Sequence, residues 1–560
     1  MGYVLKKADY KVRVKTDNLV GSGTDADVHI ILYNESGQAS RTTELTKLGN
    51  DFERGDTDSF AIYDMPNFGP VARIEIWRDS WLDDSWYVDY IEVEDKSHRM
   101  KYPFPIQRWI TRRHLVIDKY DSSLPQDSSQ PEQMRLELDR ELNKYQFVTL
   151  NEGLPPVNMQ FWDKDWYFGA QRLMGCNAAQ IKLCTEIPSK FGVTNELVDG
   201  LLDNMSLDEA LSNEQLFIVD HKILDGITST KLNDQMVLCA PIALFFVNKE
   251  EQLVPVAIQL FQEKGVDNPL GVYSCVYVFS PTNPKYTWMF FNNADAVIHE
   301  PSTHLLCTHL IMECFAVCMH RRLSQSHPIF RLLEPHFQYL ISVNHIGLPV
   351  LLDPDGWFDR VLTGGREVAF ENLEMNNIIS IVPLEDTEKL TNEWELQDWA
   401  DDVHVFVMQG MPGNGKFSTK TELIDTLTSV IFICSVGHAS VNFNQYDEYS
   451  SPLRYSMKLL GQPPESAEVA LTESDILQHI PNKTTVIEAV VMTKTLSSHG
   501  TQSLGYFDEM FQKDPISINA LRDFRENLIE VGKIIESRNK DRIAKYLYLH
   551  PSLLQNAISI

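Results

Sequence analysis

Alternating apolar and polar residues dominate the first 115 positions of the chain and predict β-strands. An alternation with a period of two places successive side chains on opposite faces of a sheet. Turn-forming Gly, Asn and Asp residues separate the alternating runs. Several short strands at this spacing favour an antiparallel β-sandwich. We expect strands over residues 10–15, 28–33, 71–77 and 86–93.

Beyond the predicted sandwich the pattern changes twice. Residues 120–135 are rich in Ser, Asp, Gln and Pro and predict a linker, which a charged helix near 133–146 follows. From about residue 156 to the end, the apolar spacing is mostly helical. The sequence therefore predicts a sandwich over 1–115, a linker with a lead-in helix over 116–155, and a mainly α-helical domain over 156–560. Individual helices are expected over 176–186, 193–203, 206–212, 303–323, 395–408, 419–443, 473–480 and 517–538.

The composition is that of an acidic globular protein with more than one domain. At 560 residues the chain is too long for a single core, and 43% of its residues are hydrophobic. A formal net charge of -29 argues against nucleic-acid binding and against simple electrostatic docking on anionic lipid. The cysteines form no CxxC pair and the N-terminus has no apolar signal-peptide run, so we expect a reduced, cytoplasmic protein. The uncharged stretch 426–445 contains His and Asn, which favours a buried helix over a membrane span.

Residues 299–313 hold three histidines and two carboxylates in a segment otherwise suited to a buried helix. Burying these groups is costly unless they are paired or bound to a metal. His304 and His309 are five residues apart, which places them roughly 140° apart on an α-helix but roughly 50° apart on a π-helix. If both bind one ion, we expect the helix to be locally π-helical. The alternative is a pair of core histidines bonded to backbone carbonyls.

Two further elements supply candidate ligands. His438 and Asn442 are four residues apart in an apolar helical stretch, so both side chains share one helix face, although a hydrogen-bonded core pair explains them equally well. The tail over residues 551–560 is apolar and ends at Ile560. If the tail docks inward, its carboxylate needs a neutralising partner such as a metal; the alternative is an undocked tail. Three imidazoles, one amide oxygen and one carboxylate suit a non-haem iron with one open position better than structural zinc.

Longer motifs resemble one known family. The run over 299–313 resembles the iron-binding signature of lipoxygenases, and residues 326–336 resemble their second signature. The helix with His438, Asn442 and Gln445, together with the terminal Ile560, is similar to the other iron-binding elements of that family. In the first domain, residues 50–55, 81–87 and 108–111 resemble the PLAT (C2-like) domain of animal lipoxygenases.

The resemblance implies a fatty-acid dioxygenase in which His304, His309, His438, Asn442 and the Ile560 carboxylate bind one non-haem iron. Bis-allylic hydrogen abstraction by a ferric hydroxide, followed by O2 addition, would convert a polyunsaturated fatty acid such as arachidonate into a hydroperoxide. The family also assigns supporting roles. Glu300 and Gln445 match positions whose hydrogen bonds orient the ligands, and Leu305 and Leu310 match apolar clamps in the substrate channel.

The same resemblance implies a Ca2+ site and a membrane-binding edge in the PLAT domain. Two loops offer carbonyl and carboxylate oxygens of the kind that Ca2+ prefers, although solvated acidic turns explain the bare sequence. Trp81 and Trp109 match loop-tip aromatics that enter the lipid interface, with sheet packing as the alternative. A Ca2+ bridge would let an acidic, cytoplasmic chain associate reversibly with a membrane. The oligomeric state stays open. The candidate calcium residues are Gly23, Thr24, Asp25, Asn50, Asp51 and Glu53.

The chain departs from the family in two places. Extra helices that animal lipoxygenases carry are lacking before residue 162, and a further helix is lacking between residues 383 and 395. Both losses would open the substrate channel. Two alternative functions follow: isomerisation of fatty-acid hydroperoxides, as in some family members, or a catalytically impaired, membrane-recruited homologue.

Overall fold

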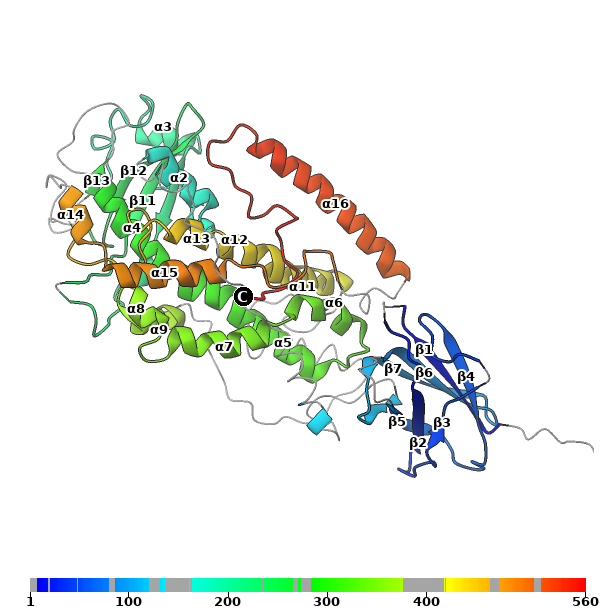
Figure 1. Cartoon of the computed structure of the whole chain (residues 1–560). Helices are drawn as coiled ribbons and strands as arrows, with labels where there is room; N and C mark the ends of the chain where they lie inside the picture. Colours follow the sequence, from blue (N-terminus) through cyan, green and yellow to red (C-terminus); the bar gives the residue numbers. More distant parts are fainter. Residues whose placement is uncertain are drawn as a thin grey trace, which may run out of the picture.

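The computed structural model describes two bodies, a β-sandwich (blue) and a larger, mainly helical domain with one sheet at the end away from the sandwich (Figure 1). The fold class expected from the sequence is confirmed. The described residues are 8–18, 21–47, 49–79, 86–119, 131–133, 135, 161, 164–233, 235–264, 270–272, 284–375, 417, 419–463, 473–507 and 515–560.

The sandwich consists of two four-stranded antiparallel sheets with the strand orders β4-β1-β6-β7 and β3-β2-β5-β8. Every second side chain of β1 is buried, as the alternation predicted. The four predicted strands are confirmed, whereas β3, β4, β7 and β8 were not foreseen. The strands are β1 (Tyr10–Thr16), β2 (Asp27–Asn34), β3 (Thr43–Glu44), β4 (Thr57–Ile62), β5 (Val71–Asp79), β6 (Trp86–Asp95), β7 (Met100–Ile110) and β8 (Leu115–Asp118).

The second domain contains an antiparallel sheet that the sequence did not predict. Its strand order is β13-β12-β11-β10-β9. The expected helices over 176–186 and 193–203 are wrong, because these residues form a short 3-10 turn, an edge strand and irregular turns. All residues of β12 are buried, so its apolar run carries no alternation by which to recognise a strand. The strands are β9 (Lys182–Leu183), β10 (Leu216–Asp220), β11 (Ile242–Val247), β12 (Leu253–Gln259) and β13 (Leu270–Val272).

Two long helical rods form the centre of this domain. The first is α4 (Pro284–Ile298), η6 (His299–Leu310) and α5 (Ile311–Arg322); the second is α11 (Lys420–Phe432), η8 (Ile433–Gly437) and α12 (His438–Asn442). By length and composition alone, the runs Thr287–Arg322 and Lys420–Tyr449 could each cross a membrane. Inside the structure, 67% of the apolar window of the first run and 44% of that of the second are buried, and both runs carry buried histidines.

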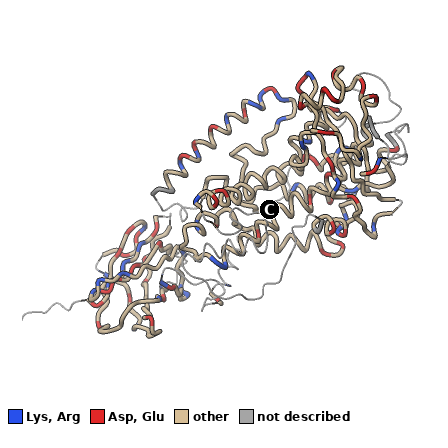
Figure 2. The backbone as a smooth tube through the Cα atoms, turned by 180° about the vertical axis from the view of Figure 1, so that it is seen from behind, with Lys and Arg blue, Asp and Glu red and all other residues tan. Residues whose placement is uncertain are grey.

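Further helices surround the rods. Figure 2 shows acidic and basic positions interspersed along the sandwich and α16, whereas the helices around the chain end are largely uncharged. The predicted helices over 206–212, 473–480 and 517–538 are confirmed as α3, α14 and α16, and the one over 395–408 lies outside the described residues. The remaining helices are η4 (Ala178–Gln180), η5 (Lys222–Leu224), α2 (Asp165–Met174), α3 (Leu207–Ser212), α6 (Pro328–Phe337), α7 (Leu340–Leu352), α8 (Trp357–Val361), α9 (Gly365–Met375), α13 (Gln445–Tyr449), α14 (Glu473–Gln478), α15 (Lys483–Leu496) and α16 (Pro515–Asn539).

The two domains touch at the turn that precedes α6. The guanidinium of Arg108, on β7, donates a hydrogen bond to the side-chain oxygen of Gln325. The guanidinium of Arg331, on α6, lies 3.1 Å from the side-chain amide of Gln107. The sandwich is thereby attached to the start of a helix whose far end lies inside the second domain.

Candidate metal centre

The helix of the first rod is widened over the segment that carries its candidate histidine ligands. Residues His299–Leu310 are π-helical, and the backbone N–H of Ile311 donates to the carbonyl of Leu306, five residues earlier. This widening confirms the prediction made from the His304–His309 spacing. The two imidazoles consequently lie next to each other, edge to face, with ring centroids 5.0 Å apart. The second rod also widens, at Ile433–Gly437 directly before His438, which the sequence analysis did not foresee.

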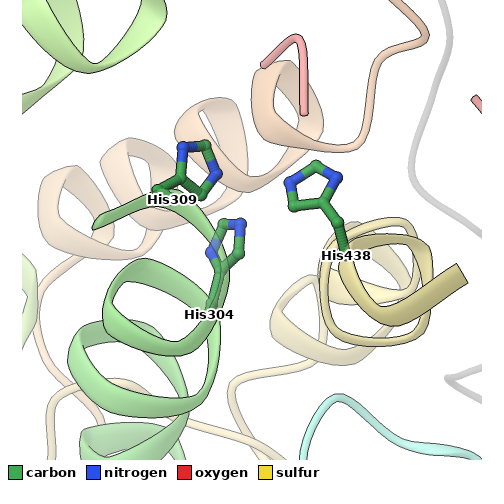
Figure 3. Close-up of side chains that lie close together, drawn as sticks. All are labelled: His304, His309 and His438. Carbon is green, nitrogen blue, oxygen red and sulfur yellow. The ribbon is translucent and has the colours of Figure 1, made fainter. Parts of the chain in front are cut away.

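Three imidazoles converge between the rods (Figure 3). One ligand nitrogen each from His304, His309 and His438 lies within 4.8 Å of the others, and all three side chains are buried. Among the described residues, this is the only such group of three or more His, Cys, Asp or Glu side chains. Within the described residues, the Nε2 atom of each histidine has no hydrogen-bond partner. Three unpartnered buried nitrogens aimed at one point fit a metal ion, which would satisfy all of them.

Burial also keeps these imidazoles neutral. It lowers the pKa of His309 to about 3, with His304 as a second cause, and it lowers the pKa of His438 well below its usual value. For His304, burial lowers the pKa and Glu300 opposes this effect. A neutral imidazole has the free lone pair that a metal requires.

Neighbouring side chains hold the two histidines of the first rod. The Nδ1 atom of His304 lies 3.4 Å from a carboxylate oxygen of Glu300. Burial alone would raise the pKa of Glu300, but His299 and His304 outweigh it and lower that pKa to about 2. The Nδ1 atom of His309 lies 2.9 Å from Oδ1 of Asn344 on α7, a partner that the sequence analysis missed. These contacts leave the Nε2 atoms of both histidines free for a ligand.

His299 joins the two rods, a role that was also missed. Its ring is fully buried, with Nδ1 2.8 Å from the Tyr449 hydroxyl and Nε2 2.8 Å from the carbonyl oxygen of Val441. Val441 directly precedes Asn442, so this bridge sets the position of the candidate amide ligand relative to the first rod.

Asn442 lies on the helix turn that follows His438 and is completely buried. Its side-chain oxygen accepts a hydrogen bond of 2.7 Å from Gln445, and its side-chain nitrogen donates one of 2.6 Å to the carbonyl of Leu496. Gln445, which the family resemblance places among the residues that orient ligands, therefore contacts the candidate ligand Asn442.

The end of the chain docks inward. Residues 554–560 are all buried, and Ile558 is part of the core between α5, α6 and α11. The label C in Figure 1 lies among the central helices. Ile560 borders the same cavity as His304 and His309, which brings the terminal residue to the histidine cluster. An undocked tail is thus ruled out for the described structure.

That cavity is small, with a volume of about 50 Å³, and has a mostly apolar lining. Leu305 lines it, as expected for a residue that clamps substrate. Leu310 is not among the lining residues; it is half-buried and packs against the hydrophobic core that contains Leu305. Other apolar residues that line the cavity are Val343, Leu348, Leu351, Phe358 and Leu496.

In the sandwich, the two candidate calcium loops are adjacent. The backbone N–H of Thr24 donates to the carbonyl of Phe52 at 3.2 Å, and Gly23 lies against the backbone of the same loop. Asp51 is engaged by Lys47, whose backbone N–H donates to it at 2.9 Å and whose ammonium lies 3.5 Å away. In the described part of the chain, the carboxylates of the loops do not converge as the three histidines do.

The remaining residues of these loops are polar and mostly exposed. The side-chain amide of Asn50 donates to Glu53 at 2.8 Å, and Asp25 is exposed. Trp109, on β7, is 37% exposed and packs edge-on against Tyr87. Trp81 lies outside the described residues, as do most of the predicted linker and the second shortened segment.

Comparison with known proteins identifies two sequence families along the chain. The lipoxygenase family profile matches residues 118–377 and 379–547, and the PLAT/LH2 domain profile matches residues 10–120. The allene oxide synthase-lipoxygenase protein of Plexaura homomalla is 26% identical over 710 residues, which cover 99% of this chain and 65% of that protein. The chain thus spans about two thirds of that relative's length.

Two more relatives match along their whole length. The arachidonate 12-lipoxygenase, 12R-type, of Mus musculus is 25% identical over 711 residues, covering 99% of this chain and all of that protein. This alignment is longer than the chain itself, so the chain is internally shorter than the mouse protein. The crystal structure of coral 8R-lipoxygenase, described with calcium activation via a C2-like domain, superposes with a TM-score of 0.71 at 25% identity and covers 98% of this chain and 100% of that one.

Proposed function

We propose that this chain, which belongs to the lipoxygenase family, is a non-haem iron dioxygenase that converts a polyunsaturated fatty acid such as arachidonate, with O2, into a conjugated hydroperoxide. The observation that carries the proposal is the convergence of three buried imidazoles whose Nε2 atoms have no hydrogen-bond partner in the described part of the chain. An imidazole-rich, thiolate-free set suits iron. The reactions of the relatives, named above, support the substrate class.

In this proposal His304, His309 and His438 hold the iron, with the Asn442 side-chain oxygen and the Ile560 carboxylate completing the set. When bound, iron supplies one-electron redox chemistry and an open coordination position. The chain's own residues keep the site in order. Burial holds the imidazoles neutral, while Glu300, Asn344 and Gln445 each orient one ligand through a hydrogen bond.

The apolar cavity provides the place for the substrate. Its wall contains Leu305 from the π-helix and Leu348 and Leu351 from α7, and the same cavity reaches His304 and His309. An apolar lining of this kind excludes water and accepts the hydrocarbon part of a fatty acid. A pentadiene held there lies beside the metal ligands, as hydrogen abstraction requires.

We further infer that the PLAT domain binds Ca2+ through the loops that contain Gly23, Thr24, Asp25, Asn50, Asp51 and Glu53, and then docks on a membrane. The adjacency of the two loops and the calcium activation described for the coral relative support this inference. Ca2+ would displace Lys47 from Asp51, and Trp109, with Trp81, would enter the lipid interface. The protein would accordingly be cytoplasmic and reversibly membrane-associated.

The metal and the product test the catalytic proposal together. We expect one iron per chain, and conjugated diene with O2 uptake when arachidonate is added. His309→Ala should lose the iron, whereas His320→Ala, which removes another histidine of the same rod outside the cluster, should keep it. A wild-type protein that is folded and iron-free would overturn the proposal. Consumption of fatty-acid hydroperoxide with little O2 uptake would instead identify an isomerase. Iron binding without turnover of any polyenoic acid would identify an impaired homologue.

The calcium proposal has its own assay. With Ca2+ present, the protein should co-float with vesicles of phosphatidylcholine and phosphatidylserine, and a chelator should release it. Asp51→Asn combined with Glu53→Gln should abolish this response. Flotation that is indifferent to Ca2+ would refute the proposed loop site.

A further inference from the structure

The second lipoxygenase-like motif, residues 326–336, forms the turn before α6 and most of α6, and its last histidine has no place in the metal cluster. We propose that His336 is a positioning residue: together with Asn556 it clamps the C-terminal segment, so that the Ile560 carboxylate is held at the metal. This inference rests on the proposed function, because it assigns a role in the same site.

His336 contacts the C-terminal segment directly, through a hydrogen bond. Its side chain is buried, and Nδ1 lies 2.8 Å from the carbonyl oxygen of Asn556. A carbonyl oxygen can only accept, so Nδ1 must carry the proton. Burial lowers the pKa of His336 to about 4, which keeps the ring neutral at physiological pH and stabilises this single arrangement. The ring is further held edge-on against Phe507.

Asn556 makes further hydrogen bonds, through its backbone N–H and through its side chain. Its backbone N–H donates to the carbonyl of Gln502 at 2.9 Å, and its side-chain oxygen accepts from the N–H of Gly505 at 3.0 Å. Its side-chain nitrogen donates to the carbonyl of Tyr506. The backbone and the side chain of one residue are therefore joined to α6 and to the 502–506 loop. Asn556 is the point at which the tail is fixed.

The four residues beyond Asn556 have little freedom. Ile558 is fully buried in the core next to α6. Ser559 lies so close to Gly500 that a Cβ at that position would come within 2.9 Å of the serine hydroxyl. Four residues span at most about 13 Å, so a displacement of Asn556 is passed on to the Ile560 carboxylate.

This clamp answers a specific physical need. The last residues of a chain are usually frayed, because few contacts hold them. A ligand that is the terminal carboxylate has no helix or strand to position it, unlike the three histidines. A neutral hydrogen bond from α6 supplies the missing constraint without adding a charge that would compete for the carboxylate.

A graded series at position 336 tests the clamp in the full-length holoenzyme. Asparagine places its amide nitrogen close to the position of Nδ1, glutamine moves the donor one bond further, and leucine removes it. We expect the rate of iron loss to a chelator to rise by about tenfold or more in His336→Leu, less in His336→Gln, and little in His336→Asn. The ferric electron paramagnetic resonance spectrum should change in the same order. His320→Leu, on α5, is the matched control and should resemble the wild type.

A double variant separates a positioning role from a general loss of stability. Because His336 is proposed to act through the carboxylate, His336→Leu should add nothing to the iron loss caused by deleting Ile560. Additive losses, or equal iron retention across the series, would overturn the clamp. Should the leucine variant not fold, the glutamine and asparagine variants still decide between ordered and equal retention. A wild type without iron would refute the proposed function itself, whereas a wild type with iron and an insensitive position 336 refutes only this inference.

Discussion

Replacing Asn344 by leucine is the sharpest test of how the metal centre is held. The Asn344 side chain joins three groups: its oxygen lies 2.9 Å from Nδ1 of His309, and its nitrogen donates to the His309 carbonyl at 3.2 Å and to Glu313 at 2.6 Å. Leucine has a similar volume and no polar atom. The variant therefore removes all three contacts without leaving a large cavity.

The expected loss follows from those contacts. Removing a hydrogen-bonded partner of a histidine ligand typically weakens metal binding by about 10–100-fold, or about 1.4–2.8 kcal/mol. Leaving the His309 and Glu313 groups unpaired costs a further ~1–3 kcal/mol of folding stability. We expect Asn344→Leu to show both effects, measured as iron affinity in a competition titration with a chelator and as stability of the metal-free protein in urea.

A control of equal burial isolates the metal effect. Asn293, on α4, is also buried, and among the described residues its side chain donates only to the backbone carbonyls of Ser456 and Met457. Asn293→Leu should lose folding stability and keep its iron affinity. If Asn344→Leu also kept its iron affinity while becoming less stable, the contact to His309 would be structural, and the proposed orientation of that ligand would be wrong.

Three further predictions concern other parts of the molecule. Burial, and then Glu448, raises the pKa of the Asp447 carboxyl from 3.8 to about 6, so its contribution to folding stability is fully present below about pH 4 and is lost as the pH rises through 6. Asp447→Asn should therefore flatten the pH dependence of stability in urea between pH 4 and 7 and raise stability by about 2–3 kcal/mol at pH 7. An unchanged pH dependence would contradict the pKa shift. A Cβ on Gly169 would come within 1.8 Å of the Leu253 carbonyl oxygen, so Gly169→Ala should push α2 away from β12. We expect this variant to lose ~2 kcal/mol of stability or more, measured by thermal unfolding. If the variant were as stable as the wild type, the two elements would not be in contact. Adding one glycine after Ile560 moves the carboxylate away from the cluster, so iron content should fall severalfold while circular dichroism stays unchanged, and full iron occupancy would remove the carboxylate from the ligand set.

The strands that were predicted correctly from the sequence are those that bury one face and leave the other more exposed. Alternation revealed β1 and β2, because one face of each strand packs and the other is more exposed. The spacing of His304 and His309 revealed the π-helix, because only a widened helix brings residues five apart onto one face. β11 and β12 were missed because they are buried on both faces, and an unbroken apolar run does not distinguish strand from helix.

The candidate ligands could be predicted from the sequence, but most of the side chains that orient them could not. Asn344 reaches His309 from 35 residues away, and Tyr449 reaches His299 from 150 residues away. Such partners are brought together by the packing of helices, and no local spacing marks them. Glu300 and Gln445 were identified through the family resemblance, and each lies within four residues of the side chain that it contacts.

Helix α6 bears on how the enzyme can be dissected. Arg331, the fourth residue of the helix, lies against the sandwich, and His336, near the other end of the helix, binds the C-terminal segment. A protein truncated to its second domain loses the sandwich and, at the same time, one of the supports of this ten-residue helix. Kinetic differences between such a fragment and the intact chain therefore combine two causes, and point variants in the full-length protein are the reference that separates them.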